Sequence, residues 1–286
     1  MEQAPSRRRE VTTTRIVLVA VAALVVAALQ IVLAVRAGAG ELWLVSVLAW
    51  GGALFVANPG EGEVPGRGAR LAGALFVTLS LLELATPQLR VADRLAPLAA
   101  GAGLLLVAGG FASIRANGRA LLLLCLPLLH PPPRAVREVL DTSQATAFAS
   151  GLLLRAFGVA VERHGTLLVL PDSSLTVAGA CSGINQMCEL LAVAVLAAVL
   201  LETTARRSAW LAASAVAVGF AVNAARIAFL AMLADGGQTD LFELWHEGSA
   251  SLLVSGLATA VWGTLCVLVV RYRVSQRRER AVAEVG

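Results

Sequence analysis

Long apolar runs recur from one end of this 286-residue chain to the other, and short arginine-containing breaks separate them. A helix needs roughly 17–25 apolar residues to cross a lipid bilayer, so such runs are typical of transmembrane helices. The composition agrees, since 58% of the residues are hydrophobic and only 15% are charged, whereas a soluble domain carries about a quarter charged residues. The sequence therefore predicts an all-α polytopic membrane protein whose surface contacts the lipid bilayer.

The runs predict about eight transmembrane helices, at residues 16–35, 42–57, 71–86, 95–112, 120–130, 183–201, 209–233 and 249–270. The fifth run is short and ends in "LPLLHPPPR", where three prolines prevent a helix from continuing, so it fits either a short span or a partly re-entrant helix. We divide the chain into a four-span N-terminal membrane region, a C-terminal membrane core and a basic tail, at residues 1–119, 120–270 and 271–286.

The basic residues indicate the orientation of these spans. All 23 are arginines, and they cluster at the ends of segments instead of forming one basic stripe, so we expect no nucleic-acid partner. With both termini in the cytoplasm, roughly twice as many arginines fall on the inner side as on the outer side, as the positive-inside rule requires. The first apolar run is longer than the apolar region of a signal peptide, so we read it as a span.

Between the fifth and sixth spans the chain is too polar to cross a membrane. Residues 134–158 predict an amphipathic helix that lies at the outer interface. The next stretch, residues 159–180, has β-branched residues, turn signals and a period near two, which together indicate a small extracytoplasmic β-hairpin. This hairpin leads directly to Cys181.

Three polar residues, Cys181, Arg226 and His246, gather toward the outer face in this topology. Cys181 lies at the outer end of the sixth span, and Asn223 and Arg226 share one face of the seventh span. His246 precedes the eighth span on the same side. Placing an arginine within a membrane span costs on the order of 2.5 kcal/mol or more of free energy. We therefore expect Arg226 to have an interaction partner or a function. A thiol, an imidazole and a guanidinium are sufficient for acyl transfer at a peptide bond.

Each of these residues also has a structural interpretation. Cys181 could be a small packing residue, although Ser182 and Gly183 leave room beside it and the following N–H groups begin a helix, which favours a thiolate. His246 could be an interfacial hydrogen-bonding residue. Arg226 could form an ion pair with Glu189, which lies two turns below Cys181. A zinc site formed by Cys181, Cys188 and His246 lacks recognisable spacing, and we expect no metal or other cofactor.

Three motifs in order resemble those of the exosortase/archaeosortase family of membrane transpeptidases. They are "ACSGI" at the head of a span, "NAARI" in the next span and a histidine in the following outer loop. The resemblance extends over roughly residues 120–270, whereas the first four spans match in hydrophobicity alone. It implies that Cys181 is the nucleophile, that Arg226 is the essential arginine and that His246 occupies the third catalytic position. Ser182, Gly183, Glu189 and Asn223 are supporting candidates.

The resemblance also implies a reaction and a location. Members of the family process secreted proteins that end in a C-terminal sorting tail, which consists of a short motif, a transmembrane helix and a basic end. We expect this protein to be a thiol protease and transpeptidase of the bacterial cytoplasmic membrane, with its active site on the extracytoplasmic side. Its partners would be such tailed substrates and an amine acceptor in the envelope.

Two other functions remain open from the sequence. A membrane cysteine protease of similar layout could always hydrolyse the intermediate instead of transferring it. A non-enzymatic transporter or assembly subunit is a further alternative, although the spans show no internal repeat and no polar path across the membrane. Replacing Cys181 with alanine separates these classes, because a transporter should tolerate the change.

Overall fold

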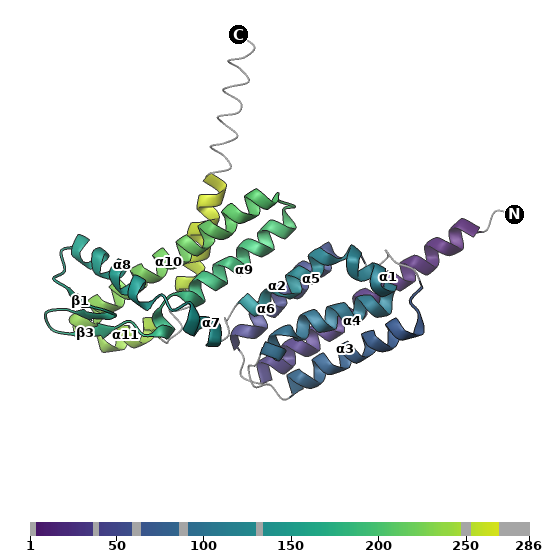
Figure 1. Cartoon of the computed structure of the whole chain (residues 1–286), viewed down its shortest axis with the longest axis horizontal. Coiled ribbons are helices and arrows are strands. Elements are labelled where there is room, and N and C mark those ends of the chain that lie inside the picture. Colours follow the sequence, from purple (N-terminus) through teal and green to yellow (C-terminus); the bar gives the residue numbers. More distant parts are fainter. Residues whose placement is uncertain are drawn as a thin grey trace, which may run out of the picture. The chain divides into compact units, whose positions relative to one another are not determined.

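The computed structural model describes residues 4–36, 40–58, 64–85, 91–129, 134–246 and 253–268, and most of them are helical (Figure 1). The chain forms two compact units, which are described separately. The first unit comprises Met1–Pro133 and Val195–Thr203. The second comprises Arg134–Ala194 and Thr204–Gly286.

Within the residues that the structure describes, the predicted spans lie mostly on helices. Three helices among the described residues are long and apolar enough to cross a membrane, namely Ala92–Ala116, Gly179–Leu200 and Ala205–Asp235. Shorter apolar helices account for four more of the expected spans, at Val17–Leu33, Val45–Val56, Gly118–Leu129 and Leu253–Leu268. The structure thus supports a helical membrane protein, and the count of eight spans stays a prediction.

The first unit contains the helices α1 (Ala4–Arg36), α2 (Gly40–Val56), α3 (Arg67–Ala85), α4 (Val91–Ala116), α5 (Gly118–Leu124) and α6 (Leu126–Leu129). Helices α3 and α4 pack very closely at Gly73 and Gly103. A Cβ atom added to Gly73 would lie only 2.5 Å from the carbonyl oxygen of Gly103. Small residues at such a crossing allow two helices to pack backbone against backbone, as is common in membranes.

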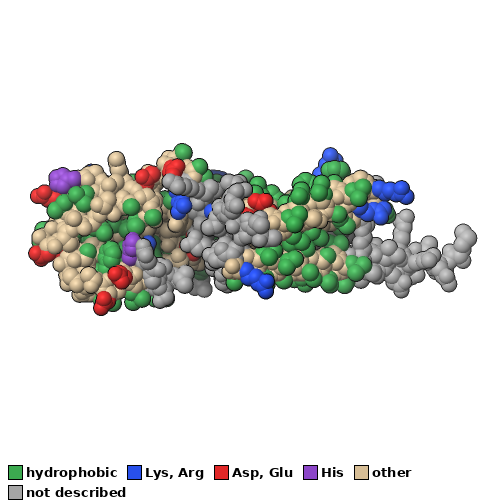
Figure 2. Space-filling view, turned by 90° about the horizontal axis from the view of Figure 1, so that it is seen from below, with side chains coloured by type: hydrophobic (Ala, Val, Ile, Leu, Met, Phe, Trp, Pro, Cys, Tyr) green, Lys and Arg blue, Asp and Glu red, His purple; other side chains and the backbone are tan. Residues whose placement is uncertain are grey.

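Much of the surface of the first unit is apolar. Large hydrophobic side chains stay exposed on its helices, among them Leu18, Val25, Leu75 and Leu79. Figure 2 shows hydrophobic side chains over much of the visible face of this unit. Contiguous apolar surface of this kind is typical of proteins that face lipid or a partner.

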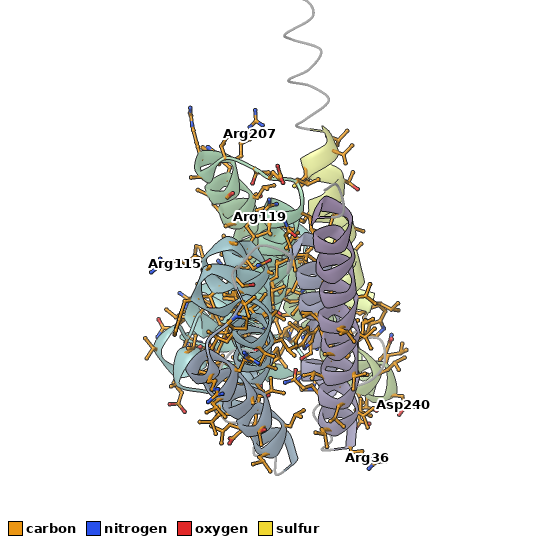
Figure 3. The ribbon with its side chains drawn as sticks, turned by 90° about the vertical axis from the view of Figure 1, so that its right-hand side faces the viewer. Arg36, Arg115, Arg119, Arg207 and Asp240 are labelled. Atoms are coloured by element: carbon orange, nitrogen blue, oxygen red, sulfur yellow. The ribbon has the colours of Figure 1, made fainter. Side chains whose placement is uncertain are left out.

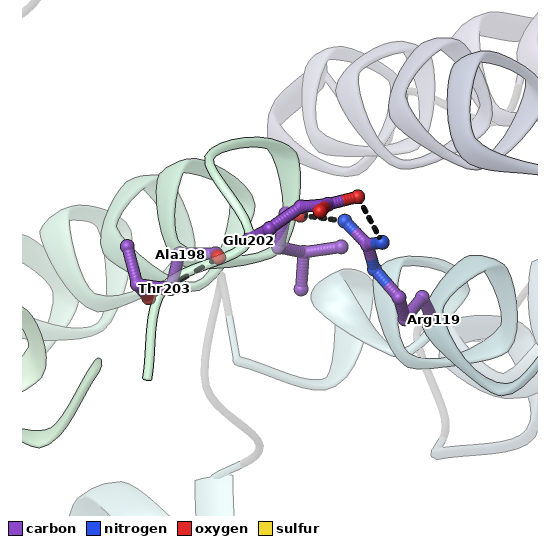
Figure 4. A network of polar contacts seen from close by, with 5 residues as sticks. Arg119, Ala198, Glu202 and Thr203 are labelled. Atoms are coloured by element: carbon purple, nitrogen blue, oxygen red, sulfur yellow. Dashed lines mark hydrogen bonds and ion pairs between the residues drawn. The ribbon is translucent and has the colours of Figure 1, made fainter. Parts of the chain in front are cut away.

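Some buried polar side chains of the first unit are hydrogen-bonded to one another, and several arginines lie near helix ends. The buried Gln30 side chain donates to the carbonyl oxygen of Ala96 at 3.1 Å and accepts the Trp50 indole N–H at 2.9 Å. Arg119, near the start of α5, pairs with Glu202 at 2.7 Å and also donates to the Val199 carbonyl (Figure 4). Figure 3 marks Arg36 at the end of α1, Arg115 in the last turn of α4, and Arg119.

The second unit carries the residues of interest. In chain order it contains α7 (Arg134–Val139), α8 (Ser143–Ala156), β1 (Glu162–His164), β2 (Leu167–Val169), β3 (Ser174–Thr176), the 3-10 helix η1 (Gly179–Cys181), α9 (Ile184–Leu200), α10 (Ala205–Asp235) and α11 (Thr239–His246). Helix α9 begins in this unit and ends in the first. The helix Leu253–Leu268 follows and is joined to α9 and α10 by side-chain hydrogen bonds.

Two predictions about residues 134–180 need correction. The single amphipathic helix is two helices, because Asp141 accepts hydrogen bonds from the N–H and hydroxyl of Ser143 and thereby starts α8 as a separate helix. The hairpin is a three-stranded antiparallel sheet in the order β1-β2-β3. A third strand forms because Leu170 donates to the Ser173 carbonyl and turns the chain back after β2.

These elements surround the C-terminal part of α10. Its residues Ile227, Leu230 and Ala231 are buried in one core with Leu154 of α8 and Leu168 of β2. The Ser150 hydroxyl of α8 also donates to the carbonyl oxygen of Ala224 at 2.9 Å. Helix α11 was predicted only as an outer loop, since it is eight residues long and follows two glycines.

Candidate active site

Cys181 is the last residue of η1 and stands between β3 and α9. Its N–H donates to the Ala178 carbonyl at 2.8 Å, and the next N–H, of Ser182, donates to Gly179 at 3.3 Å. The side chain is half-buried and lies at the edge of the core that α8, the sheet and α10 form. The thiol is thus held by a tight turn and stays accessible.

The imidazole of His246 contacts this thiol. The distance from Cys181 Sγ to His246 Nε2 is 3.5 Å, which is within hydrogen-bonding range for sulfur. His246 ends α11, and its ring stacks on the ring of Phe242 one turn earlier, with centroids 5.3 Å apart. A second ring pair, Phe229 with Trp245, packs α11 against α10. The structure therefore joins a thiol and a base that are 65 residues apart in the chain.

Arg226 connects α10 to the end of α11. Its Nη2 atom donates to the carbonyl oxygens of Trp245 at 3.1 Å and His246 at 2.6 Å. The last carbonyls of a helix carry partial negative charge, so a guanidinium there both completes their hydrogen bonding and stabilises the helix end. The guanidinium also interacts electrostatically with Cys181. Its Nε atom is buried and has no hydrogen-bond partner in the described part of the protein.

Asn223 and Gly183 shape the turn that follows the cysteine. The Asn223 side chain donates to the carbonyl oxygen of Cys181 at 3.1 Å. Gly183 has φ +93°, a conformation that favours glycine. A Cβ atom at this position would come within 2.7 Å of Asn223 Nδ2. Both sequence-predicted supporting residues therefore lie directly at the turn.

Ser182 is fully buried, and its carbonyl oxygen is bound by two residues that sequence analysis did not identify. The hydroxyls of Thr142 and Thr146 both donate to it at 2.6 Å. The Ser182 hydroxyl in turn accepts the N–H of Ile184 at 3.5 Å. No sequence signal marks these threonines, because threonine is common and a bond to a distant carbonyl leaves no motif.

Glu189 takes partners other than Arg226. Its Oε2 atom accepts the Gln186 amide at 3.1 Å and the Ser255 hydroxyl at 2.8 Å. The alternative in which Glu189 forms an ion pair with Arg226 is therefore not realised in the structure. In the described part of the chain no three His, Cys, Asp or Glu side chains are grouped so that they could hold a metal ion.

A pocket adjoins the turn on the side that precedes Cys181. It has a volume of about 470 Å³ and is lined by Arg137, Glu138, Asp141, Gly179 and Ala180. The hydrogen bonds from Ser143 hold the pKa of Asp141 below its usual value, so one wall of the pocket carries a carboxylate at neutral pH. Gly179 and Ala180 immediately precede Cys181 in the chain.

The comparison with protein families identifies the chain. The family model described as transmembrane exosortase (Exosortase_EpsH) matches residues 7–263. The chain belongs to the transmembrane exosortase family. The motifs pointed to this family over residues 120–270, whereas the match begins at residue 7 and therefore includes the first four predicted spans. Exosortases are membrane proteins of a cysteine peptidase-like class with a transpeptidase-type role. A comparison with curated proteins and one with solved structures each found no match.

Proposed function

We propose that this exosortase is a membrane cysteine transpeptidase that removes the C-terminal sorting tail of secreted proteins and transfers each protein to an amine acceptor in the envelope. The observation that carries the proposal is the 3.5 Å contact between Cys181 Sγ and His246 Nε2. Arg226 holds the same histidine through its carbonyl oxygen. Nucleophile, base and a nearby positive charge are the parts that cysteine acyl transfer requires.

Helix lengths support a site at the membrane boundary. Helix α10 has 31 residues and is about 46 Å long at 1.5 Å per residue, whereas the hydrocarbon core of a bilayer is about 30 Å thick. Its C-terminal part is surrounded by α8, the sheet and α11. We therefore place the part before Asn223 within the membrane and Arg226 at its outer boundary. The scissile bond of a tailed substrate, just outside the substrate's own transmembrane helix, would reach the same level.

The first half of the reaction forms a thioester. His246 Nε2 takes the proton of the Cys181 thiol, and the thiolate attacks the carbonyl carbon of the scissile peptide bond. The carbon–nitrogen bond then breaks, the leaving amine receives the proton from His246, and the tail departs with a new N-terminus. The secreted protein stays bound to Cys181 as an acyl group.

The second half restores the enzyme. An acceptor amine attacks the thioester while His246 takes one of its protons, a new amide bond forms, and the proton returns to the Cys181 sulfur. Arg226 stabilises the thiolate and the oxyanion through its charge and its remaining N–H donors, together with N–H groups at the start of α9. One good donor to such an oxyanion contributes about 3–4 kcal/mol.

The test is made in the host that carries the gene, where the substrates are present. Replacing Cys181 with alanine should leave a set of secreted proteins in the membrane with their C-terminal tails intact, as measured by mass spectrometry of C-terminal peptides. His246→Ala should give the same accumulation. If Cys181→Ala protein is present at the normal level and no tailed protein accumulates, the proposed activity is wrong.

The same measurement separates transfer from hydrolysis. A processed protein that carries an added mass at its new C-terminus has been transferred to an acceptor. A processed protein with a free carboxylate has been hydrolysed, which would support the hydrolysing protease instead.

A further inference from the structure

The turn that carries Cys181 is held from α8 by an unusual pair of hydrogen bonds. Thr142 and Thr146, here called the threonine pair, both donate their hydroxyls to the carbonyl oxygen of Ser182 at 2.6 Å. Thr146 and Ser182 are fully buried and Thr142 is partly buried, so water has little access to the shared carbonyl oxygen. A buried carbonyl with two short hydroxyl donors is strongly fixed in place.

The role of Thr142 is not the one its position predicts. Thr142 is the N-cap residue of α8, where a threonine oxygen usually accepts a backbone N–H, yet its side chain makes no such bond. Asp141 accepts the N–H of Ser143 at 3.0 Å in its place. The Thr142 hydroxyl is therefore available to donate across to Ser182.

The threonine pair binds the carbonyl oxygen just before the start of α9, beside Gly183, whose φ of +93° also interrupts the helix there. The N–H of Met187 donates to the Gly183 carbonyl at 3.0 Å in the normal helical pattern. One residue earlier, the same pattern would direct the N–H of Gln186 to the Ser182 carbonyl, but the threonines bind that oxygen. Without them, Ser182 would be free to join α9, and the turn at Cys181 would be rewound toward a helix.

We infer that Thr142 and Thr146 are positioning residues, which keep the turn at Ser182 out of α9 and thereby hold the Cys181 thiol at His246. Asn223 fixes the preceding carbonyl, that of Cys181, from the side of α10. Side chains from two helices thus hold two consecutive carbonyls. The inference rests on the proposed function only in taking Cys181 as the nucleophile, and the hydroxyls of both threonines bind the Ser182 carbonyl oxygen.

The test compares Thr142→Val, Thr146→Val and the double variant with the wild type. The rate at which iodoacetamide modifies Cys181 in the purified full-length protein is followed by peptide-resolved mass spectrometry at neutral pH. Removal of one buried hydrogen bond is worth about tenfold in an equilibrium, so the double variant should react at least about tenfold more slowly. Thr142→Ser and Thr146→Ser keep the hydroxyl and should restore the wild-type rate.

Ser150→Ala is the matched control. It removes a buried hydroxyl-to-carbonyl bond of the same kind from the same helix, but the acceptor is Ala224 of α10. It should lower the melting temperature as the valine variants do and leave the alkylation rate of Cys181 unchanged. Equal alkylation rates in the double valine variant, Ser150→Ala and the wild type would overturn the inference. Tail processing is measured in a separate experiment, with Cys181→Ala in the host. If that experiment fails to support the proposed function, the alkylation rates still test the positioning role of the threonines.

Discussion

Arg226 donates from Nη2 to the carbonyl oxygen of His246 at 2.6 Å, and the imidazole of the same histidine lies 3.5 Å from Cys181 Sγ. The arginine thus holds the backbone of the proposed base, whose ring contacts the proposed nucleophile. Its hydrogen bonds go to the carbonyl oxygens of Trp245 and His246 at the end of α11. In the proposed mechanism Arg226 therefore positions His246 in addition to stabilising charge.

Arg226→Met should therefore lose activity more severely than Arg226→Lys. Methionine removes the charge and both hydrogen bonds to the end of α11, and loss of a charge-assisted bond costs about 1.5–3 kcal/mol, or roughly 10- to 100-fold. Lysine keeps the charge and one compact donor group, so its loss should be smaller. Both variants are compared with the wild type by the extent of tail processing in the host and by the alkylation rate of Cys181 in the purified protein. The exposed Arg207, at the start of α10 (Figure 3), is the control, since Arg207→Lys should change neither.

Gly183→Ala should disrupt the turn after the nucleophile. The residue has φ +93°, which costs an L-residue roughly 1–2 kcal/mol, and the new methyl group would press on the Asn223 amide. Gly179→Ala is the matched control, because a Cβ atom there meets nothing within 4 Å. The first variant should lose most of its processing activity and the second should keep it. Equal activity in the two variants would contradict the role assigned to this turn.

Glu189→Gln should reduce activity by less than about threefold, since a glutamine oxygen can still accept the bonds from Gln186 and Ser255. The prediction follows from the absence of a Glu189–Arg226 ion pair. A loss as large as that of Arg226→Met, measured in the same processing assay, would mean that the two charges act together after all.

Asp141 makes the stability of the folded protein depend on pH, and the direction of this dependence follows from its pKa. Its pKa is lowered in the folded protein by the hydrogen bonds from the Ser143 side chain and backbone. The stability that it contributes is therefore fully present above its ordinary pKa and is lost as the pH falls through the lowered value, that is, below about pH 3.9. Asp141→Asn removes this titration. The difference in melting temperature between wild type and Asp141→Asn should change below that pH and stay constant between pH 5 and 8.

Much of the helical architecture is predictable because bilayer thickness imposes long apolar segments. Helix α9 begins and ends within one residue of the predicted span, and α10 extends beyond its prediction at both ends. The sequence also predicts that Cys181 and His246 lie on one side of the membrane, and the structure brings the two side chains into contact. Their contact was not predictable, since it depends on α11, whose eight residues are too few to give a clear apolar period.

Side-chain partners within the site were less accessible to sequence reasoning. Similar depth suggested that Glu189 pairs with Arg226, but Ser255 reaches Glu189 from a segment 66 residues away. The threonine pair binds a backbone oxygen, which every residue offers, so no residue type marks the acceptor. Such contacts depend on how α8, α9 and the helix Leu253–Leu268 pack, which only the folded chain shows.

The central claim is that Cys181 carries the secreted protein as a thioester, and hydroxylamine tests it most directly. This amine attacks thioesters and leaves a hydroxamate on the released acyl group. Membranes from the host are incubated with hydroxylamine, and the C-termini of the released proteins are read by mass spectrometry. We predict hydroxamate C-termini with wild-type protein and none with Cys181→Ala. If the wild type removes tails at its normal rate while no hydroxamate forms, the thioester mechanism is contradicted.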